Sequence, residues 1–168
     1  METKEYRSQM MSKIRSTGGK AEVMLAKSLW HRGIRYRKNL KTLPGKPDIA
    51  ITKHKIAIFV DGEFWHGYDW DNLKHIRPKK NREYWIPKIE GNMKRDREVN
   101  TKLLELDWLV FRFWERRQVK KNLEECLLKI ETAILYRTYE EEIKKIASTP
   151  QLESEDYFLI DAMFYLME

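Results

Sequence analysis

The stretch that decides the fold is residues 43–66, which read LPGKPDIAITKHKIAIFVDGEFWH. Ile56 to Val60 form an almost unbroken apolar run, which is typical of a strand buried on both faces of a sheet. A second strand-like segment, residues 48–52, precedes this run across a short polar turn, and each segment has an acidic residue at one end. The stretch therefore predicts two neighbouring strands that deliver carboxylates close to each other.

Segments on both sides of this pair add helices and further strands. Apolar side chains recur at helical spacing in residues 20–32, which predicts an amphipathic helix. Residues 34–38 and 108–114 carry β-branched and aromatic side chains, so both favour strands. Residues 62–80 follow no period and predict a long functional loop, and residues 121–147 predict another helix. A chain of 168 residues with these elements fits one compact domain.

The clearest periodic element is a helix predicted from Glu83 to Leu106. Its inward stripe follows alternating steps of four and three residues, and consists of Trp85, Ile89, Asn92, Asp96, Val99, Leu103 and Leu106. Two members of this stripe are polar. Burying Asn or Asp costs about 1–3 kcal/mol unless the side chain finds partners. Asn92 and Asp96 are therefore expected to face a functional site.

The overall charge favours an anionic partner. The chain has a formal net charge of +7 and a sequence pI near 9.4. Clustered Lys and Arg gain affinity by releasing counterions from a phosphate backbone, so nucleic acid is favoured over a membrane. Residues 138–168 hold eight acidic residues against two lysines, so the basic surface belongs to the earlier part of the chain.

Cysteine usage and the chain start bear on the compartment. Cys126 is the single cysteine, which excludes an intrachain disulfide and a zinc site built from several cysteines. The opening residues METKEYRSQM lack the apolar core of a signal peptide, and no apolar run approaches the roughly 20 residues that span a bilayer. We expect a soluble, cytoplasmic protein.

Three acids near the strand pair are candidates for metal chemistry: Asp48, Asp61 and Glu63. Phosphodiester hydrolysis needs clustered carboxylate and carbonyl oxygens, because they hold the divalent cations that neutralise charge on the phosphate and activate water. Alternatively, Asp48 and Asp61 have only a structural role, because Pro-Asp and Asp-Gly dipeptides are typical of turns. The spacing alone leaves both interpretations open.

The next segment, Phe64-Trp65-His66-Gly67, combines a titratable group with two large aromatic side chains. A histidine here can act as a general base or orient a water, because its ordinary pKa lies near the working pH. Neighbouring aromatics at a loop tip suit wedges that enter a base stack. Alternatively, this segment covers the hydrophobic core, and the histidine only makes hydrogen bonds that stabilise the fold. Trp85 either inserts into DNA as a third aromatic side chain or packs in the core.

Cationic side chains surround this loop: Lys74, Arg77, Lys79, Lys80, Arg82, Lys88, Lys94, Arg95 and Arg97, with Lys4, Arg7, Lys13, Arg15 and Lys20 nearer the N-terminus. Charged runs are most often solvated faces. Here they flank the candidate site and alternate with aromatics, which favours phosphate contacts.

Linked motifs in residues 5–130 resemble the very short patch repair (Vsr) endonucleases. They are residues 43–48 (LPGKPD), 59–66 (FVDGEFWH), 83–96 (Glu83 to Asp96), 10–15 (Met10 to Arg15) and 108–115 (Trp108 to Glu115). The resemblance implies an α/β, restriction-endonuclease-like fold with a mixed central sheet flanked by helices. It also implies Mg²⁺-dependent nicking of one DNA strand beside a thymine–guanine mismatch.

The resemblance also implies roles for individual residues. Asp48 would be the central ligand of two Mg²⁺ ions, with Mn²⁺ as a substitute, and the Val60 carbonyl would be a further ligand. His66 would be the base, supported by Asp96, and Glu22 matches an acidic residue near the site. Asp61 and Glu63 are additional candidate ligands. The expected DNA contacts are Phe64, Trp65, Trp85, Asn92, Lys46, Arg95, Arg15, Lys79 and Lys80.

The chain departs from the family pattern in two places. Well-known members hold a structural zinc with three cysteines and a histidine around this loop, whereas this chain has Glu63 and Arg116 and no cysteine nearby. We predict no structural zinc, and a brace through Asp69, Trp70, Asp71 and His75 in its place, unless these residues form a solvated loop or an unrelated metal site.

The second departure is the C-terminal segment, which matches nothing in the family. We expect an endonuclease domain over residues 1–135, with a DNA-contacting arm over residues 1–19, and a helical extension over residues 136–168. The apolar residues 157–167 predict a docked helix, or a surface for a protein partner or a second copy. Three functions stay open: a mismatch-nicking repair enzyme, a restriction or defence nuclease that cuts matched DNA, and a catalytically idle DNA-binding protein.

Overall fold

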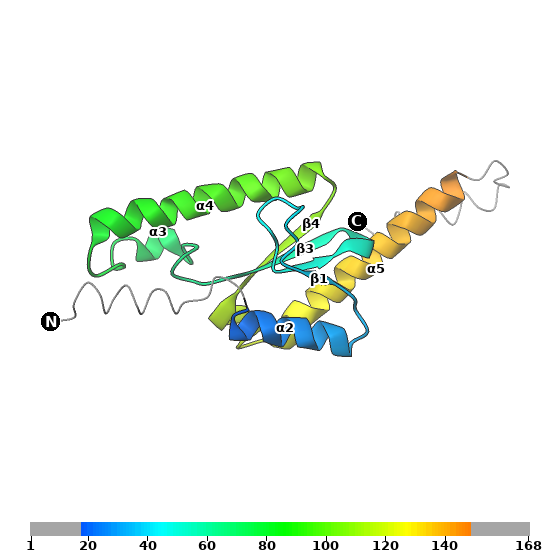
Figure 1. Ribbon diagram of the computed structural model, residues 1–168, viewed down its shortest axis with the longest axis horizontal. Helices are drawn as coiled ribbons and strands as arrows, with labels where there is room; N and C mark the ends of the chain where they lie inside the picture. The colour runs from blue at the N-terminus through cyan, green and yellow to red at the C-terminus, as the bar shows by residue number, and fades with distance from the viewer. Residues whose placement is uncertain (1–17, 149–168) are drawn as a thin grey trace. The chain divides into compact units, whose positions relative to one another are not determined.

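The computed structural model describes residues 18–148, which form an α/β arrangement with a four-stranded mixed sheet (Figure 1). The helical elements are α2 (Lys20–His31), η1 (Thr52–His54), α3 (Trp70–Leu73), α4 (Arg82–Glu105), the π-helical turn η2 (Glu115–Val119) and α5 (Leu123–Ala147). The strands are β1 (Arg37–Lys38), β2 (Ile49–Ile51), β3 (Ile56–Asp61) and β4 (Leu109–Trp114). The predicted contact of Arg15 and the predicted helix over residues 157–167 lie outside the described residues.

The sheet has the order β1-β2-β3-β4. Its first two pairings are antiparallel, and β3 pairs with β4 in parallel, with Asp61 opposite Trp114. Antiparallel β2 and β3 need only the short η1 turn between them, whereas a parallel pair needs a long crossover, which includes α4. The crossover places the C-terminal ends of β3 and β4 at the same end of the sheet.

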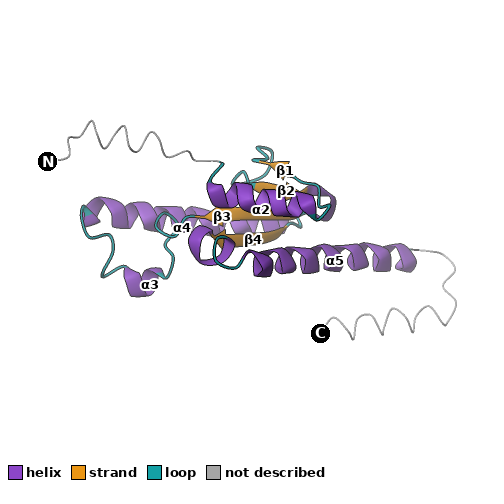
Figure 2. Cartoon of the chain, turned by 90° about the horizontal axis from the view of Figure 1, so that it is seen from below, coloured by secondary structure: helices purple, strands orange, loops and turns teal. Residues whose placement is uncertain are grey.

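Helices cover both faces of the sheet, which explains the continuous apolar run in β3. Figures 1 and 2 show α4 on one face and α2 on the other. On the α4 face, Ala57 and Phe59 form a buried cluster with Leu103. On α2, Leu25 and Leu29 are fully buried. Successive strand residues point to opposite faces, so a strand covered on both sides is apolar at almost every position.

The predicted elements are confirmed with shifted ends. The predicted strand over residues 34–38 shortens to two residues, and the predicted loop over residues 62–80 contains the short α3. The π-helical turn η2 had no sequence signal. Ile89 and Leu103 on α4 are buried, but Leu106, which directly follows the helix, is 51% exposed, so its predicted inward position is wrong. The helix ends at Glu105, and the helical phase does not extend past the last turn.

A tight turn at residues 43–46 brings the chain into β2. Gly45 has a φ of +69°, and an added Cβ would lie 2.4 Å from Cγ1 of Val99 on α4. Only glycine fits both the left-handed backbone and this close approach. The turn therefore packs against α4 immediately before Asp48, which fixes where that carboxylate enters the sheet.

The chain divides into two compact units between Lys129 and Ile130, a point inside α5. In the described part of the second unit, Glu140 accepts hydrogen bonds from Arg137 at 2.8 Å and from Lys144 at 3.0 Å along one side of the helix. Pairs at this spacing stabilise an exposed helix modestly. Within residues 18–148, no helix combines the length and the apolar character that crossing a membrane requires.

Candidate active site

Asp48 lies just before β2, at the end of the sheet where β3 finishes. Its Oδ2 accepts a hydrogen bond from the Val60 backbone N–H at 2.8 Å, which ties the two strands together. Burial raises the pKa of the Asp48 carboxyl to about 6; the N–H of Val60 lowers it, and the nearby carboxylates of Glu22 and Asp61 raise it further. Such a desolvated carboxylate among other acids is poised to gain a cation.

His66 and Asp96 form the second part of the site. The Nδ1 atom of His66 lies 2.6 Å from Oδ2 of Asp96, and 3.6 Å from Oδ1 of Asp61. Burial opposes protonation of His66, but the hydrogen bond to Asp96 and the charge of Asp61 outweigh it, so the pKa of His66 is raised. Burial likewise opposes ionisation of Asp96, and the bond from His66 and the charge of Arg112 outweigh it, so the pKa of Asp96 is lowered.

Arg112 on β4 links the acids of the site. Its Nη1 lies 2.8 Å and 3.0 Å from the two carboxylate oxygens of Asp61, and its Nη2 lies 3.2 Å from Oδ1 of Asp96. Its Nε donates to Oδ1 of Asn100 at 2.9 Å, and the guanidinium lies 4.2 Å above the ring of Phe59. Arg112 thus binds Asp61 and Asp96 at once, and holds the His66–Asp96 pair in place.

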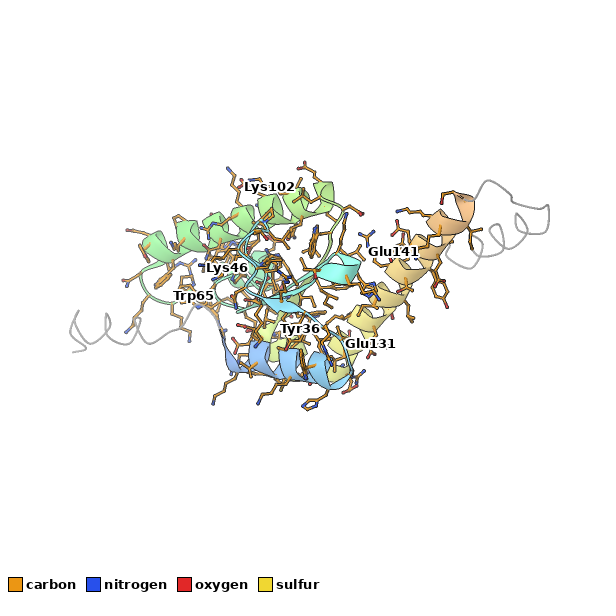
Figure 3. The ribbon with its side chains drawn as sticks, turned by 45° about the vertical axis from the view of Figure 1, so that its right-hand side comes forward. Tyr36, Lys46, Trp65, Lys102, Glu131 and Glu141 are labelled. Carbon is orange, nitrogen blue, oxygen red and sulfur yellow. The ribbon has the colours of Figure 1, made fainter. Side chains whose placement is uncertain are left out.

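An aromatic cluster stands beside these charged groups. Phe64, Trp65 and Trp85 meet edge to face, with ring centroids 5.2–5.4 Å apart, and Tyr84 lies 4.9 Å from Trp85. Phe64 is 40% exposed. Figure 3 shows Trp65 near the N-terminal part of α4, far along the helix from Lys102. The cluster presents apolar rings to solvent next to the candidate catalytic groups.

Comparison with known proteins agrees with this arrangement of acids, histidine and aromatics. The family model described as DNA mismatch endonuclease Vsr matches residues 1–72. A type II nicking enzyme of Haemophilus parainfluenzae is 48% identical over 128 residues, which is 76% of this chain and 89% of that protein. The chain belongs to the Vsr family of endonucleases.

Two other relatives support the assignment of the chain to this family. A type II nicking enzyme of Neisseria meningitidis serogroup C is 48% identical over 132 residues, covering 79% of this chain and 88% of that protein. The DNA mismatch endonuclease Vsr of Escherichia coli K12 is 35% identical over 112 residues, covering 67% of this chain and 70% of that protein. The chain is therefore an endonuclease that acts on DNA, and the α/β restriction-endonuclease-like fold predicted from the motifs is confirmed.

Most of the predicted site residues of this Vsr-family endonuclease come together. Asp48, Asp61, His66 and Asp96 share one electrostatic network, and Glu22 on α2 is buried close enough to affect Asp48. Asn92 faces inward as the helical phase predicts, and its amide donates to the Trp65 carbonyl at 2.8 Å. The remaining predicted DNA contacts in the described residues are exposed: Lys46, Lys79, Lys80 and Arg95.

The loop carrying the aromatics is held by residues that sequence reasoning had not assigned to this role. Oε1 of Glu63 accepts hydrogen bonds from the backbone N–H groups of Arg116 and Arg117, at 2.8 Å and 3.0 Å, where η2 begins. The Tyr68 ring lies 5.1 Å from Trp114, and the Arg117 guanidinium lies 4.4 Å from the Tyr68 ring. Glu63 is a candidate metal ligand in the sequence, but in the structure one of its carboxylate oxygens accepts the hydrogen bonds that hold the loop in place.

The predicted brace was different. Of its four members, Trp70 donates to Oε1 of Glu90 on α4 at 3.3 Å, whereas Asp69 accepts from Asn72 within the loop at 2.6 Å. Asp71 and His75 are exposed. The brace therefore includes Trp70, and otherwise runs from Glu63 and Tyr68 to the end of β4, a connection that no local pattern reveals.

Arg112→Met is expected to lower the free energy of unfolding by about 2–4 kcal/mol, because it leaves two largely buried carboxylates without their cation. Urea unfolding at neutral pH measures this loss. Arg112→Lys keeps the charge but not the planar guanidinium, so its free energy of unfolding should lie between those of the wild type and Arg112→Met. Adding Asp61→Asn to Arg112→Met should recover part of the loss. A loss below about 0.5 kcal/mol for Arg112→Met would be that of an ordinary surface substitution, and would reject the linking role.

Proposed function

We propose that this Vsr-family endonuclease nicks one strand of double-stranded DNA at a thymine–guanine mismatch, with Mg²⁺ as cofactor. The observation that carries the proposal is the proximity of a desolvated Asp48 to the His66–Asp96 pair, with the Phe64–Trp65–Trp85 cluster beside them. These three parts offer a metal ligand, a proton acceptor and a wedge for the duplex.

The donor set suits Mg²⁺. Asp48 supplies a carboxylate whose pKa of about 6 reflects burial beside other acids, an environment that a divalent cation relieves. The Val60 carbonyl belongs to the residue whose N–H binds that same carboxylate, so it is the natural second ligand. Within the described residues, no three acidic, histidine or cysteine side chains converge on one metal position. Mg²⁺ commonly binds one or two carboxylates and completes its shell with water and substrate phosphate.

In this proposal the residues divide the chemistry between them. Bound Mg²⁺ would neutralise the charge that develops on the scissile phosphate. Nδ1 of His66 faces Asp96, which leaves Nε2 to accept a proton from the attacking water. Asp96 and Arg112 fix the orientation of the imidazole, as a supporting acid does for any catalytic histidine. Asp61, bound by Arg112, adds negative charge near both groups.

The aromatic cluster supports recognition of a distorted duplex. Rings that enter a base stack cost unstacking energy, which is smallest where pairing is already imperfect. The Asn92 bond to the Trp65 carbonyl fixes the backbone that presents the rings, so they are oriented before DNA arrives. The exposed Lys46, Lys79, Lys80 and Arg95 are placed to contact phosphates.

The relatives support cleavage of a single strand. Those at 48% identity are named type II nicking enzymes, and the Escherichia coli relative is named a DNA mismatch endonuclease. We carry both properties to this chain as parts of the proposal. A nuclease that cuts both strands of matched DNA is the second candidate, and it draws its motivation from the C-terminal residues that the family pattern does not cover.

The test is a cleavage assay on duplexes that differ only in one base pair. Each strand is labelled in turn, and thymine–guanine, thymine–adenine and cytosine–guanine versions are incubated with Mg²⁺, Ca²⁺ or EDTA. We expect one nick, in one strand, only in the thymine–guanine duplex with Mg²⁺. Equal nicking of matched duplexes would reject mismatch specificity and retain the nuclease. Cleavage of both strands at one matched sequence would support the second candidate.

A further inference from the structure

A cleft of about 890 Å³ lies beside the aromatic cluster, and neither Asp48 nor His66 contributes to its lining. One wall is the loop after β3, from Gly62 to Arg77. The other wall consists of residues between Trp114 and Lys121, around the π-helical turn η2. The cleft is therefore distinct from the groups proposed to bind the metal and to accept a proton, and the proposed chemistry gives it no role.

The charge in the cleft is positive. Its two acids are engaged, because Glu63 accepts two backbone N–H groups and Glu115 pairs with Lys120. Clefts that carry one sign of charge between walls of low dielectric constant focus their electric field and attract ions of the opposite sign. The occupant of this cleft is therefore expected to be an anion. Four cationic side chains supply the charge: Arg77, Arg116, Arg117 and Lys121.

The cations of the cleft differ from other cations of the same loop in what they bind. Arg82 donates hydrogen bonds to three backbone carbonyl groups of the loop, at 2.7–3.3 Å, and Lys74 pairs with a glutamate on α4. In contrast, no ion pair or side-chain hydrogen bond within residues 18–148 engages the cationic groups of Arg77, Arg116 or Lys121, and all three side chains are exposed. These three cations are available to an external anion.

The cleft and the aromatic cluster share one loop. Phe64 and Trp65 line the cleft and also contact Trp85 in the cluster. Glu63 directly precedes these rings, and its carboxylate accepts the backbone N–H of Arg116 on the opposite wall. The rings that face DNA and the cations of the cleft are thus held at a set separation by hydrogen bonds within the protein.

Insertion of these rings would bring DNA backbone to the cleft. Aromatic rings that enter a base stack separate neighbouring base pairs and bend the duplex, and bending brings more protein surface against the DNA. The bases stay within the duplex, so the anionic groups next to the point of entry are backbone phosphates. Cationic side chains that bind such phosphates fix the position of a protein along DNA.

We propose that the cleft binds the sugar–phosphate backbone of the duplex next to the mismatch, with phosphates on Arg116 and Lys121, while Phe64 and Trp65 enter the adjacent base step. The proposal rests on the proposed function, because it assumes that these rings enter the duplex. It gives the cleft a positioning role: the phosphate contacts set where along the strand the rings enter, and therefore which phosphodiester bond reaches Asp48.

Neutral methylphosphonate linkages locate the phosphate contacts without any need for cleavage. A methylphosphonate replaces one phosphate at a time around the mismatch in each strand, and the affinity of the full chain for each duplex is measured in EDTA. We expect at least one position where this replacement weakens binding by the wild type but not by the double variant Arg116→Gln with Lys121→Gln. If every position that affects the wild type affects the double variant equally, the proposal is overturned.

The salt dependence of binding counts the contacts. Arg116→Gln with Lys121→Gln is expected to weaken binding of the mismatched duplex about tenfold, and to reduce the slope of log affinity against log salt by about 2. The backbone N–H groups that bind Glu63 remain in this variant, so the loop keeps its attachment. The control, Lys27→Gln with Lys53→Gln, removes two exposed charges outside the cleft and should change affinity less than about twofold. Equal losses in both double variants overturn the assignment.

Free phosphate is the other possible source of the anion. Sodium phosphate should displace the duplex no more than sodium chloride does at equal ionic strength, because the cleft holds phosphates as part of a strand. Stronger displacement by sodium phosphate would show that the free ion is the ligand, and would overturn the duplex as the occupant.

Nicking of the thymine–guanine duplex in Mg²⁺, measured in parallel, separates this proposal from the proposed function. If the wild type nicks this duplex but no methylphosphonate effect depends on Arg116 and Lys121, the cleft assignment alone is overturned. If such an effect is found and the duplex is not nicked, the proposed function is overturned and the cleft assignment is supported.

Discussion

Replacing Asp48 with asparagine is expected to reduce DNA nicking by a factor of about 10³ or more, because it removes a metal ligand worth several kcal/mol of charge stabilisation. The fold should survive, since the asparagine carbonyl can still accept the hydrogen bond from Val60. The measurement is the single-turnover rate on the mismatched duplex, together with binding in EDTA. Asp107→Asn, which changes an exposed acid paired with Lys55, is the control and should keep the full rate.

The same substitution should make the metal-free protein more stable. The pKa of Asp48 is raised to about 6 from 3.8, so the folded protein binds this proton more tightly than the unfolded chain. Stability therefore falls as pH rises from about 4 to about 6, and stays low above that range. Asparagine removes this penalty, and at pH 7.5 in EDTA we expect a gain of about 1–3 kcal/mol. Mg²⁺ should raise the melting temperature of the wild type only.

These outcomes distinguish a ligand from a structural residue. A variant that loses both activity and stability would show that Asp48 mainly supports the fold. A variant that keeps its rate would show that the active site lies elsewhere. Wild-type activity should also decline below about pH 6, as protons compete with the cation for a carboxylate of this pKa.

His66→Gln and Asp96→Asn should each lower the nicking rate about 10²–10⁴-fold, the usual contribution of a positioned general base. Because the two side chains meet at 2.6 Å, they are expected to act as a unit, and the double variant should be no slower than the slower single variant. Single-turnover rates of the three variants give this comparison. The control is Glu98→Gln, which changes an exposed acid on the same helix and should keep the wild-type rate.

The pH profile gives a second readout for this pair. The wild-type rate should rise with pH through the raised pKa of His66, because only the neutral imidazole accepts a proton. Without the Asp96 carboxylate, burial remains as the largest effect on His66, and burial lowers the pKa. In Asp96→Asn, the midpoint of the residual activity should therefore move to lower pH. A rate loss that is the product of the two single losses, with an unmoved midpoint, would contradict a shared role.

Local patterns were sufficient for much of the fold and for parts of the site. The apolar run of β3 follows from burial on both faces, because such burial makes almost every residue of the strand apolar and is therefore visible in the local sequence. The inward position of Asn92 and Asp96 follows from helical phase, because residues three and four apart share one face. Leu106 shows where that phase stops, since the helix ends one residue earlier.

What the sequence by itself determined, then, is which residues could do the chemistry: the acids and histidine at or next to the ends of the strands, the aromatic segment, and the polar positions on α4. Only the tertiary structure decided how they are connected. Arg112 meets Asp61 across 51 residues, and Glu63 meets Arg116 across 53. Both contacts depend on the parallel register of β3 and β4, in which Asp61 lies opposite Trp114. That register is set by the packing of α4 and the sheet as a whole, and interactions between distant segments leave no periodic trace in either segment alone.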